Sequence, residues 1–364
     1  MAVYRIFPSQ DSFISTEKTS SNAGLDEILE VAGYPYFGDG KTSRSLVKFS
    51  TTEIRDVINN EIRSTNFTSS LKLYLAYASE LPSDFSVYSY PIAENWDNGV
   101  GKFDDSPAST IGVNWINSRT DVPWTTSSFS SYVTASGEVS GGGSWYTGSL
   151  SGSLQFSQSF SVGDNLDLSI NVTPAVVEHY NGTLNNYGFV VKLQNSYEYY
   201  ESSSIILRYF SKDTNTIYPP CLEFKWDDSA YNTGSLSVLQ TSNSRIFVNN
   251  IRANFIDSGK YRYRISAKPK YPTRTFTTSS IYKTNYALPS SSYWALKDDH
   301  TEEMIIDFDT TATKISCDSS GSYFDIYMGG LQPERYYKIL IKTVIDGTTT
   351  VVDDNNIFKV VRNG

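Results

Sequence analysis

The stretch that decides the fold is residues 44–49, which read Arg-Ser-Leu-Val-Lys-Phe. Ser45, Val47 and Phe49 alternate with Leu46 and Lys48, and alternation with a period of two is typical of a β-strand. One face of this strand carries Val47 and Phe49, so it is expected to lie on a hydrophobic core. The stretch therefore predicts a sheet.

The same pattern recurs on both sides of it, interrupted by turn residues. Further strands are expected at 3–7, 12–15, 71–76, 87–92, 155–160, 166–172, 189–193, 205–210 and 222–226. Two short helices are predicted among them. Residues 52–63 place apolar side chains at i, i+3, i+4 and i+8, and residues 175–180 follow Thr173-Pro174 and end at Asn181-Gly182. The sequence therefore predicts an all-β protein with one or two short helices.

The composition fits this reading and excludes some partners. The 364 residues are 39% apolar, 19% charged and 14% aromatic, with 27 Tyr against 2 His. The net charge of -9 argues against binding to nucleic acid or to an anionic membrane surface, because both need a basic face. No apolar run is long enough for a membrane-spanning helix, and no signal peptide is visible. We therefore expect a protein that folds in the cytosol.

Two domains are expected. The polar, turn-rich residues 227–234 predict a linker, which divides the chain into domains at 1–228 and 229–364. The second domain has alternating runs at 261–265, 304–308, 323–328 and 337–344, and an Asp346-Gly347 hairpin turn. Such short strands indicate a β-sandwich. Cys221 and Cys317 lie far apart without metal-ligand spacing, so both are expected to be buried, reduced thiols.

Three segments of the first domain resemble the DNRLRE family of jelly-roll β-sandwich domains, which is related to carbohydrate-binding modules. They are residues 44–49, residues 112–115 with 123–124, and residues 186–192 (which include Tyr187 and Phe189) with 219–224. The opening, residues 6–30, is similar to virion proteins of large tailed phages that carry this domain. The resemblance implies an N-terminal jelly roll. Since exported family members need a signal peptide, a phage particle component that assembles in the host cytoplasm is favoured.

The second domain carries a short signature of its own. Leu331, Pro333 and Tyr337 are spaced as Leu-x-Pro-x-x-x-Tyr. This spacing resembles the tyrosine corner of fibronectin-type and immunoglobulin-like sandwiches, in which the Tyr hydroxyl satisfies a backbone group. The resemblance implies a C-terminal immunoglobulin- or fibronectin-like β-sandwich.

Aromatic side chains are the candidate binding residues. Rings that stack on sugars or anchor a partner protein are expected at Trp96, Trp145, Tyr197, Tyr199 and Tyr200. Large aromatic residues also dominate sandwich cores. For Trp115 and Trp124, core packing is the favoured interpretation.

No catalytic residue is predicted. His179 and His300 lie in different predicted domains, and neither has a nucleophile and an acid nearby. The Asp doublets, such as Asp104-Asp105, point to opposite faces of a strand and so make no opposed acid pair. No phosphate-binding loop, nucleophile elbow, zinc helix or EF-hand loop is present. We predict no cofactor and no metal, with a structural calcium ion in a jelly-roll loop left open.

These observations predict a non-enzymatic structural component of a tailed-phage virion, in the neck, tail, baseplate or head appendage. It would contact other virion proteins, as a homo-oligomer or in many copies. The alternative is a carbohydrate-binding adhesin that recognises host glycans. A glycan hydrolase or lyase is the least favoured interpretation.

Overall fold

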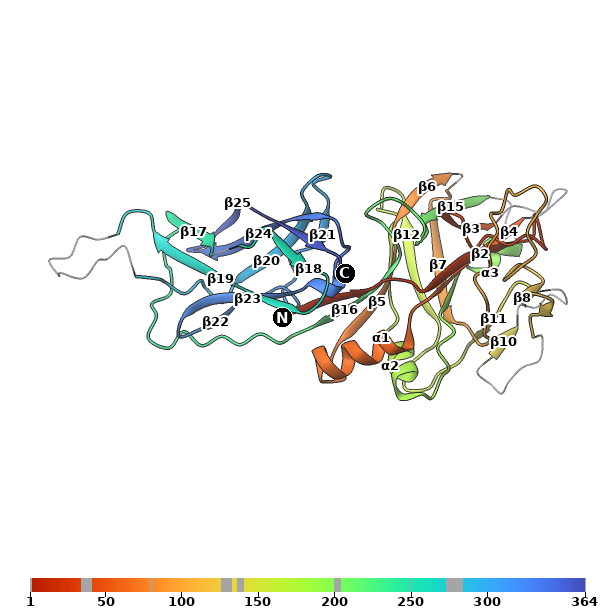
Figure 1. The fold of residues 1–364 in the computed structure, drawn as a ribbon, viewed down its shortest axis with the longest axis horizontal. Coiled ribbons are helices and arrows are strands. Elements are labelled where there is room, and N and C mark those ends of the chain that lie inside the picture. Colours follow the sequence, from red (N-terminus) through yellow and green to blue (C-terminus); the bar gives the residue numbers. More distant parts are fainter. Residues whose placement is uncertain are drawn as a thin grey trace. The chain divides into compact units, whose positions relative to one another are not determined.

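The computed structural model describes residues 2–33, 41–79, 81–125, 133–135, 141–199, 204–249, 251–272 and 284–363. The described chain is all-β with a few short helices, which confirms the predicted fold class (Figure 1). It divides into two compact units. The large unit comprises residues 6–223, and the small unit comprises residues 1–5 with 224–364. The division into domains at 1–228 and 229–364 stays a prediction.

The large unit contains two curled sheets. One has the order β12 (Phe156–Ser161), β7 (Asp84–Pro91), β14 (Phe189–Leu193), β4 (Thr42–Lys48), β3 (Ile28–Gly33), β15 (Ile205–Phe210) and β6 (Leu75–Ser79), with β2 (Gln10–Ser15) also paired to β4. The other pairs β5 (Thr68–Leu73) with β13 (Leu168–Asn171) and includes residues 221–223 of β16 (Cys221–Trp226). Residues 2–5 of β1 (Ala2–Ile6) and 224–226 of β16 belong to the small unit. The connection from β7 to β12 carries two small ladders, β8 (Asn117–Arg119) with β9 (Val122–Pro123) and β10 (Val133–Ala135) with β11 (Ser144–Tyr146).

Strand β4, which contains most of the stretch that predicted a sheet, is buried on both faces. It pairs with β14, with Val47 opposite Phe189 and Leu46 opposite Val190. Val47 and Phe189 point to one face of the sheet, whereas Leu46 and Val190 point to the other. The second face is buried because the long connection after β7 folds over it.

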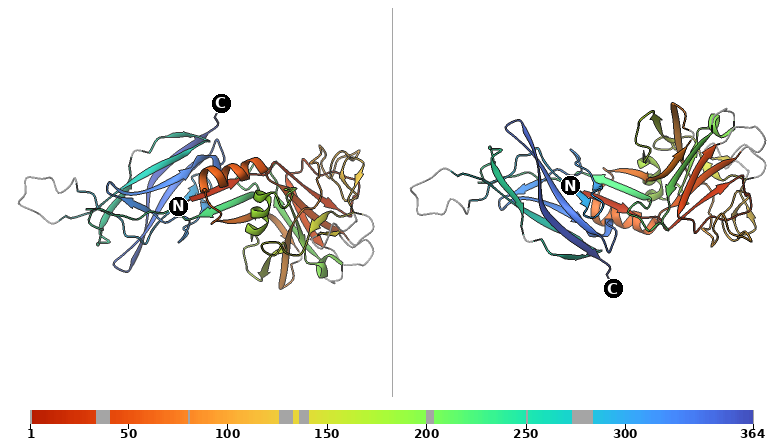
Figure 2. Two further views of the ribbon diagram at one scale, coloured as in Figure 1. Left: turned by 90° about the horizontal axis from the view of Figure 1, so that it is seen from below. Right: turned by 90° about the horizontal axis from the view of Figure 1, so that it is seen from above.

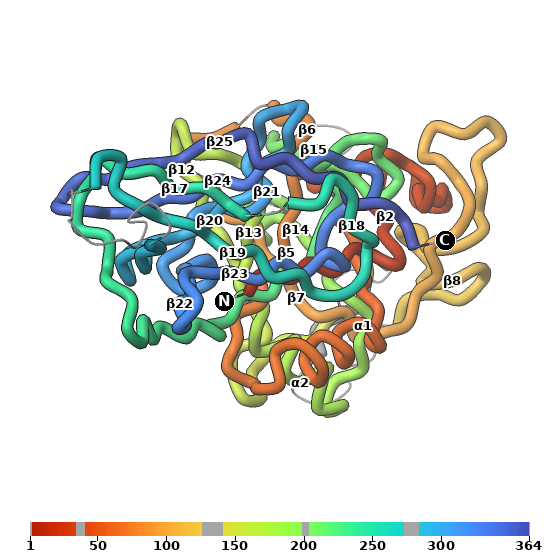
Figure 3. The backbone as a smooth tube through the Cα atoms, turned by 60° about the vertical axis from the view of Figure 1, so that its left-hand side comes forward, coloured from red at the N-terminus to blue at the C-terminus, as the bar shows by residue number. Residues whose placement is uncertain are grey.

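The helices follow the predicted apolar stripes. Helix α1 (Thr51–Asp56) continues into a wider π-helical segment, η1 (Val57–Ile62), and the Ser50 hydroxyl caps the start. Helix α2 (Thr173–Asn181) lies beside α1, as Figure 3 shows, and ends at Gly182, whose φ of 77° suits glycine. A third helix, α3 (Asn195–Tyr199), was not predicted from the sequence.

The small unit is a second sandwich (Figure 2). One sheet has the order β17 (Ser244–Val248), β19 (Lys260–Pro269), β23 (Gly321–Tyr327) and β22 (Ser316–Asp318). The other has the order β18 (Asn254–Ile256), β25 (Thr348–Val361), β24 (Tyr336–Ile345), β20 (Ser292–Asp298) and β21 (Met304–Ile306). Aromatic rings from both sheets fill the core. Phe324 stacks on Tyr263 at 5.3 Å and on Trp294 at 5.4 Å.

The predicted tyrosine corner forms a local backbone contact. The hydroxyl of Tyr337, which is buried, donates a hydrogen bond of 2.9 Å to the carbonyl oxygen of Gln332. Leu331 is buried in the same core, and Pro333 is half-buried. Burial raises the pKa of Tyr337, so its hydroxyl keeps the proton that it donates.

Each unit contains one buried cysteine. Cys221 lies on β16 within the large unit, and Cys317 lies on β22 within the small unit. Burial raises the pKa of the Cys317 thiol. None of the helices in the described parts of the chain is long and apolar enough to cross a bilayer.

Candidate functional site

The outer face of the large sheet brings together the chemistry that the sequence scatters. Alternate residues of neighbouring strands point to this face, because the side-chain period of a strand is two. Arg44 on β4, Lys192 on β14, and Tyr88 and Tyr90 on β7 all lie here. The register places Lys192 opposite Tyr88. This face is therefore the first candidate site.

The four tryptophans of the long connection pack on this face as one buried core. Trp96, Trp115, Trp124 and Trp145 cluster with Leu46 of β4 and neighbouring apolar side chains. The indole N–H of Trp96 donates to the carbonyl of Tyr187 at 2.8 Å, and that of Trp124 to Asn114 at 3.0 Å.

Two of these residues need a correction. Trp96 and Trp145 were expected to present exposed rings to a sugar or partner, but both are buried. The reason is that the connection covers the sheet with its own indole rings. Trp115 and Trp124, for which core packing was favoured, are buried in the same cluster.

The glycines at 141–143 pack beside this cluster. All three are buried and have positive φ. A Cβ on Gly141 would lie 2.0 Å from the carbonyl oxygen of Trp115, and the carbonyl of Gly142 accepts a hydrogen bond from Arg44. Glycine is needed here because the backbone approaches other groups closely.

Next to the tryptophans lies a buried ion cluster. The Arg44 guanidinium donates two hydrogen bonds to the Glu198 carboxylate, of 3.0 and 2.9 Å. The Lys192 ammonium lies 2.8 Å from the same carboxylate and donates to Asn195 at 2.7 Å. The side chains of Arg44 and Glu198 are 0% exposed. The cluster therefore ties α3 to strands β4 and β14.

The electrostatics of the cluster follow from burial. Desolvation lowers the pKa of Lys192 to about 8, although the neighbouring Glu198 carboxylate opposes this shift. The Arg44 guanidinium also lies 4.8 Å from the ring of Trp115 and 5.2 Å from that of Trp145, which adds cation–π attraction. Two cations and one carboxylate therefore share a dry, aromatic environment.

The accessible part of this face is a row of tyrosines that the sequence analysis did not single out. Tyr88 and Tyr90, here called the tyrosine row, are half-buried, with ring centroids 6.2 Å apart and planes within 13°. Tyr90 also contacts the ring of Trp145 at 5.9 Å. The alternating pattern within residues 84–91 could have predicted this pair, because it places both tyrosines on one face of the strand.

The hydroxyl groups of the tyrosine row can both donate and accept hydrogen bonds. Burial raises the pKa of Tyr90 to about 12, so the hydroxyl stays protonated and can donate as well as accept. No described residue hydrogen-bonds to either hydroxyl. On the adjacent edge strand β12, Ser157 lies opposite Tyr88 and is exposed. Rings beside hydroxyl groups suit a ligand with both apolar and polar faces, such as a sugar.

Of the remaining predicted tyrosines, Tyr197 is the one whose side chain is described. Tyr197 of α3 is half-buried, and its hydroxyl donates to the carbonyl of Asp84 at 2.9 Å. Tyr199 belongs to the helical backbone of α3, and its side chain is not described. Tyr200 lies outside the described residues.

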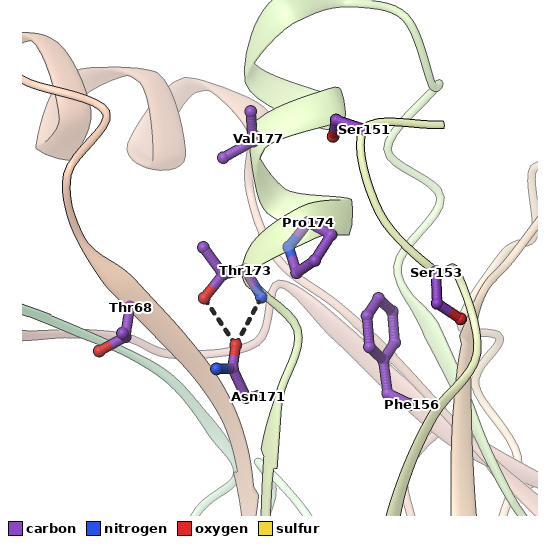
Figure 4. A pocket seen from close by; sticks show the side chains of 8 residues that line it. All are labelled: Thr68, Ser151, Ser153, Phe156, Asn171, Thr173, Pro174 and Val177. Atoms are coloured by element: carbon purple, nitrogen blue, oxygen red, sulfur yellow. Dashed lines mark hydrogen bonds between the residues drawn. The ribbon is translucent and has the colours of Figure 1, made fainter. Parts of the chain in front are cut away.

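A separate open groove of about 500 Å³ lies where α2 begins, and Figure 4 shows its lining. Its lining residues are Thr68, Ser151, Ser153, Phe156, Asn171, Thr173, Pro174 and Val177. The amide of Asn171 accepts hydrogen bonds from both the backbone N–H and the hydroxyl of Thr173. No lining side chain is acidic or basic, so the groove holds no acid–base pair.

The two histidines of the chain lie in different units. His179 is buried on α2, and burial lowers its pKa to about 4, whereas His300 is exposed. Within the described residues, no three His, Cys, Asp or Glu side chains are grouped so that they could hold a metal ion.

No protein-family model matches the chain, and a search of curated proteins finds no match.

Proposed function

We propose that this chain is a non-enzymatic structural component of a tailed-phage virion that makes protein–protein contacts in the particle. The resemblance of its first domain to phage-borne jelly rolls supports this role. The structural observation that carries the proposal is a rigid surface of loops with exposed apolar side chains. It consists of Leu25, Val100 and Ile111, which are 40%, 61% and 54% exposed, and is here called the loop surface.

The loop surface is held in place by one buried side chain. The Asn22 amide donates to the carbonyls of Asn98 and Val113, both at 2.8 Å, and accepts from the backbone of Gly24 and Gly101. Four hydrogen bonds from one side chain tie three loop segments together.

Close backbone contacts hold the same segments. The N–H of Leu25 bonds to the carbonyl of Gly101 at 2.9 Å, and a Cβ on Gly112 would lie 2.3 Å from Gly99. Apolar groups held rigidly in water are typical of interaction sites, because binding then costs little conformational entropy.

Incorporation into particles tests this proposal. Particles from the infected host are purified by density gradient and analysed by mass spectrometry, which should detect the chain at a fixed ratio to the capsid protein. Val100→Asp with Ile111→Asp should reduce incorporation at least ten-fold, because charges would be desolvated in the contact. The control is Val162→Asp, at a site that is 82% exposed on another loop. Absence of the chain from particles, or normal incorporation of the double variant, would contradict the proposal.

The tyrosine row favours a second candidate, a host-glycan adhesin. Its rings and hydroxyls lie on the outer face of a sandwich whose sequence resembles domains related to carbohydrate-binding modules. A glycan array should then show a specific ligand, and Tyr88→Ala with Tyr90→Ala should abolish binding. Tyr77→Ala, at an exposed tyrosine on β6, is the control. Silence of the wild-type chain across the array counts against the adhesin.

A further inference from the structure

A track of cations runs along the outer face of one sheet of the small unit. On β19, Lys260, Arg262, Arg264 and Lys268 point outward, whereas the residues between them, 261, 263, 265 and 267, face the core. Eight residue steps of a strand span about 26 Å. The track therefore presents a straight line of positive charge.

Two of these cations are held in fixed positions. Arg262 donates to both oxygens of Asp325, at 2.9 and 3.0 Å, and Arg264 donates to both oxygens of Asp318, at 2.6 and 2.8 Å. Both guanidinium groups also lie against the ring of Tyr323, at 4.0 and 4.9 Å from its centre. Each guanidinium retains N–H donors beyond this pair, since arginine has five.

At the other end of the track, two like charges face each other. Arg245 on the edge strand β17 lies directly opposite Lys268 in the register. Both lie about equally far from the ring of Phe247, at 6.0 and 5.9 Å. No acidic side chain of the described chain pairs with either. Like charges opposite each other on neighbouring strands are destabilising, and an anion between them would relieve the repulsion.

The charge of this surface contrasts with that of the chain. The basic face, defined as Arg245 with the four cations of β19, also includes Asp318 and Asp325. Its five cations and two carboxylates give a local charge of +3, whereas the whole chain carries -9. Charge complementarity therefore favours an anionic ligand on this face.

We propose that the basic face binds an anionic polysaccharide, through carboxylate or sulfate groups along its chain. A stable protein partner would need an apolar centre, but the rings on this face are covered or flanked by cations. A single-stranded nucleic acid would need open rings for base stacking, and the Tyr323 ring already carries two guanidinium groups. A linear polyanion matches the straight track. This site is separate from the protein contacts proposed above.

Binding of defined oligosaccharides tests the proposal on the full chain. The probes are fluorescent hexamers of a polyuronate and of a sulfated heparin fragment, with a neutral dextran hexamer and oligothymidylate for comparison. Fluorescence anisotropy at low ionic strength should show binding to the uronate probe or the sulfated probe. The ratio of the two Kd values identifies the preferred anion. Arg245→Ser with Lys268→Ser should raise the Kd at least ten-fold and reduce the salt slope by about two, one for each lost cation.

Two further variants distinguish the loss of these particular cations from a general loss of positive charge. Arg252→Ser with Lys342→Ser removes the same charge from elsewhere in the small unit and should leave the Kd within two-fold. Lys342 is a matched control because it also lies near aromatic rings, on the opposite sheet. The charge-retaining Arg245→Lys with Lys268→Arg should bind like the wild type. Absence of binding to both anionic probes, equal weakening by the control double variant, or tighter binding of oligothymidylate would overturn the proposal.

Discussion

Replacing Glu198 by Gln should strongly destabilise the large unit. The substitution keeps the shape of the side chain but removes the carboxylate that contacts both Arg44 and Lys192, whose charges are buried. Breaking a buried ion pair from one side typically costs 3–5 kcal/mol. Because the amide oxygen of Gln still accepts one hydrogen bond, we expect a loss of about 3 kcal/mol, near the low end.

Urea unfolding followed by tryptophan fluorescence measures this loss. Four of the six tryptophans belong to the core beside the ion cluster, so the signal reports mainly on the large unit. The matched control is Glu27→Gln, which removes an exposed carboxylate 2.7 Å from Lys102 and should leave the midpoint nearly unchanged. A loss for Glu198→Gln no larger than the roughly 1 kcal/mol of a surface ion pair would refute the reasoning.

The same variant should respond to pH in a characteristic way. Lys192 has a pKa of about 8 in the folded chain and 10.5 as its ordinary value. Between these values the unfolded chain binds a proton that the folded chain has released, so this group makes stability rise with pH. Without the Glu198 carboxylate, the pKa of Lys192 falls further, so the rise should begin below pH 8. The difference from wild type should therefore shrink in alkaline solution. A constant difference across this range would contradict the assignment.

Three further outcomes are expected. Burial raises the pKa of Asp11 from 3.8 to about 7, so the folded chain holds a proton that the unfolded chain releases, and stability from this group falls as pH rises through that window. Asp11→Asn should remove this fall, as urea midpoints across the window would show; an unchanged slope argues against it. Asn22→Ala deletes four buried hydrogen bonds and should cost about 3 kcal/mol, with faster hydrogen exchange of the loop amides at Gly24 and Gly101. Unchanged exchange would contradict its tethering role. Tyr337→Phe leaves the Gln332 carbonyl without its partner and should cost about 1–2 kcal/mol, seen as a lower midpoint for the small unit.

The strands and helices were predictable where local patterns determine them. The runs at 189–193 and 205–210 match β14 and β15, because β-branched and aromatic residues are bounded there by turn residues. The stripe over 52–63 matches α1 with its π-helical continuation. In each case the residues that determine the strand or helix lie close to one another in the sequence.

The candidate site was predictable only in part. Glu198 and its partner Arg44 are 154 residues apart, and no local pattern reports such a pairing. Burial of Trp96 and Trp145 depends on which face of the sheet the long connection covers, and their composition and spacing carry no such information. The tyrosine row could have been found, because alternation in β7 places Tyr88 and Tyr90 on one side.

The two buried cysteines provide a built-in reporter of opening. Each compact unit contains one thiol that solvent does not reach, Cys221 in the large unit and Cys317 in the small unit. A thiol reagent added during stepwise denaturation would modify each residue only when its own surroundings open. Peptide mapping of the modified chain would then rank the two units by resistance to unfolding in a single sample, without an introduced label.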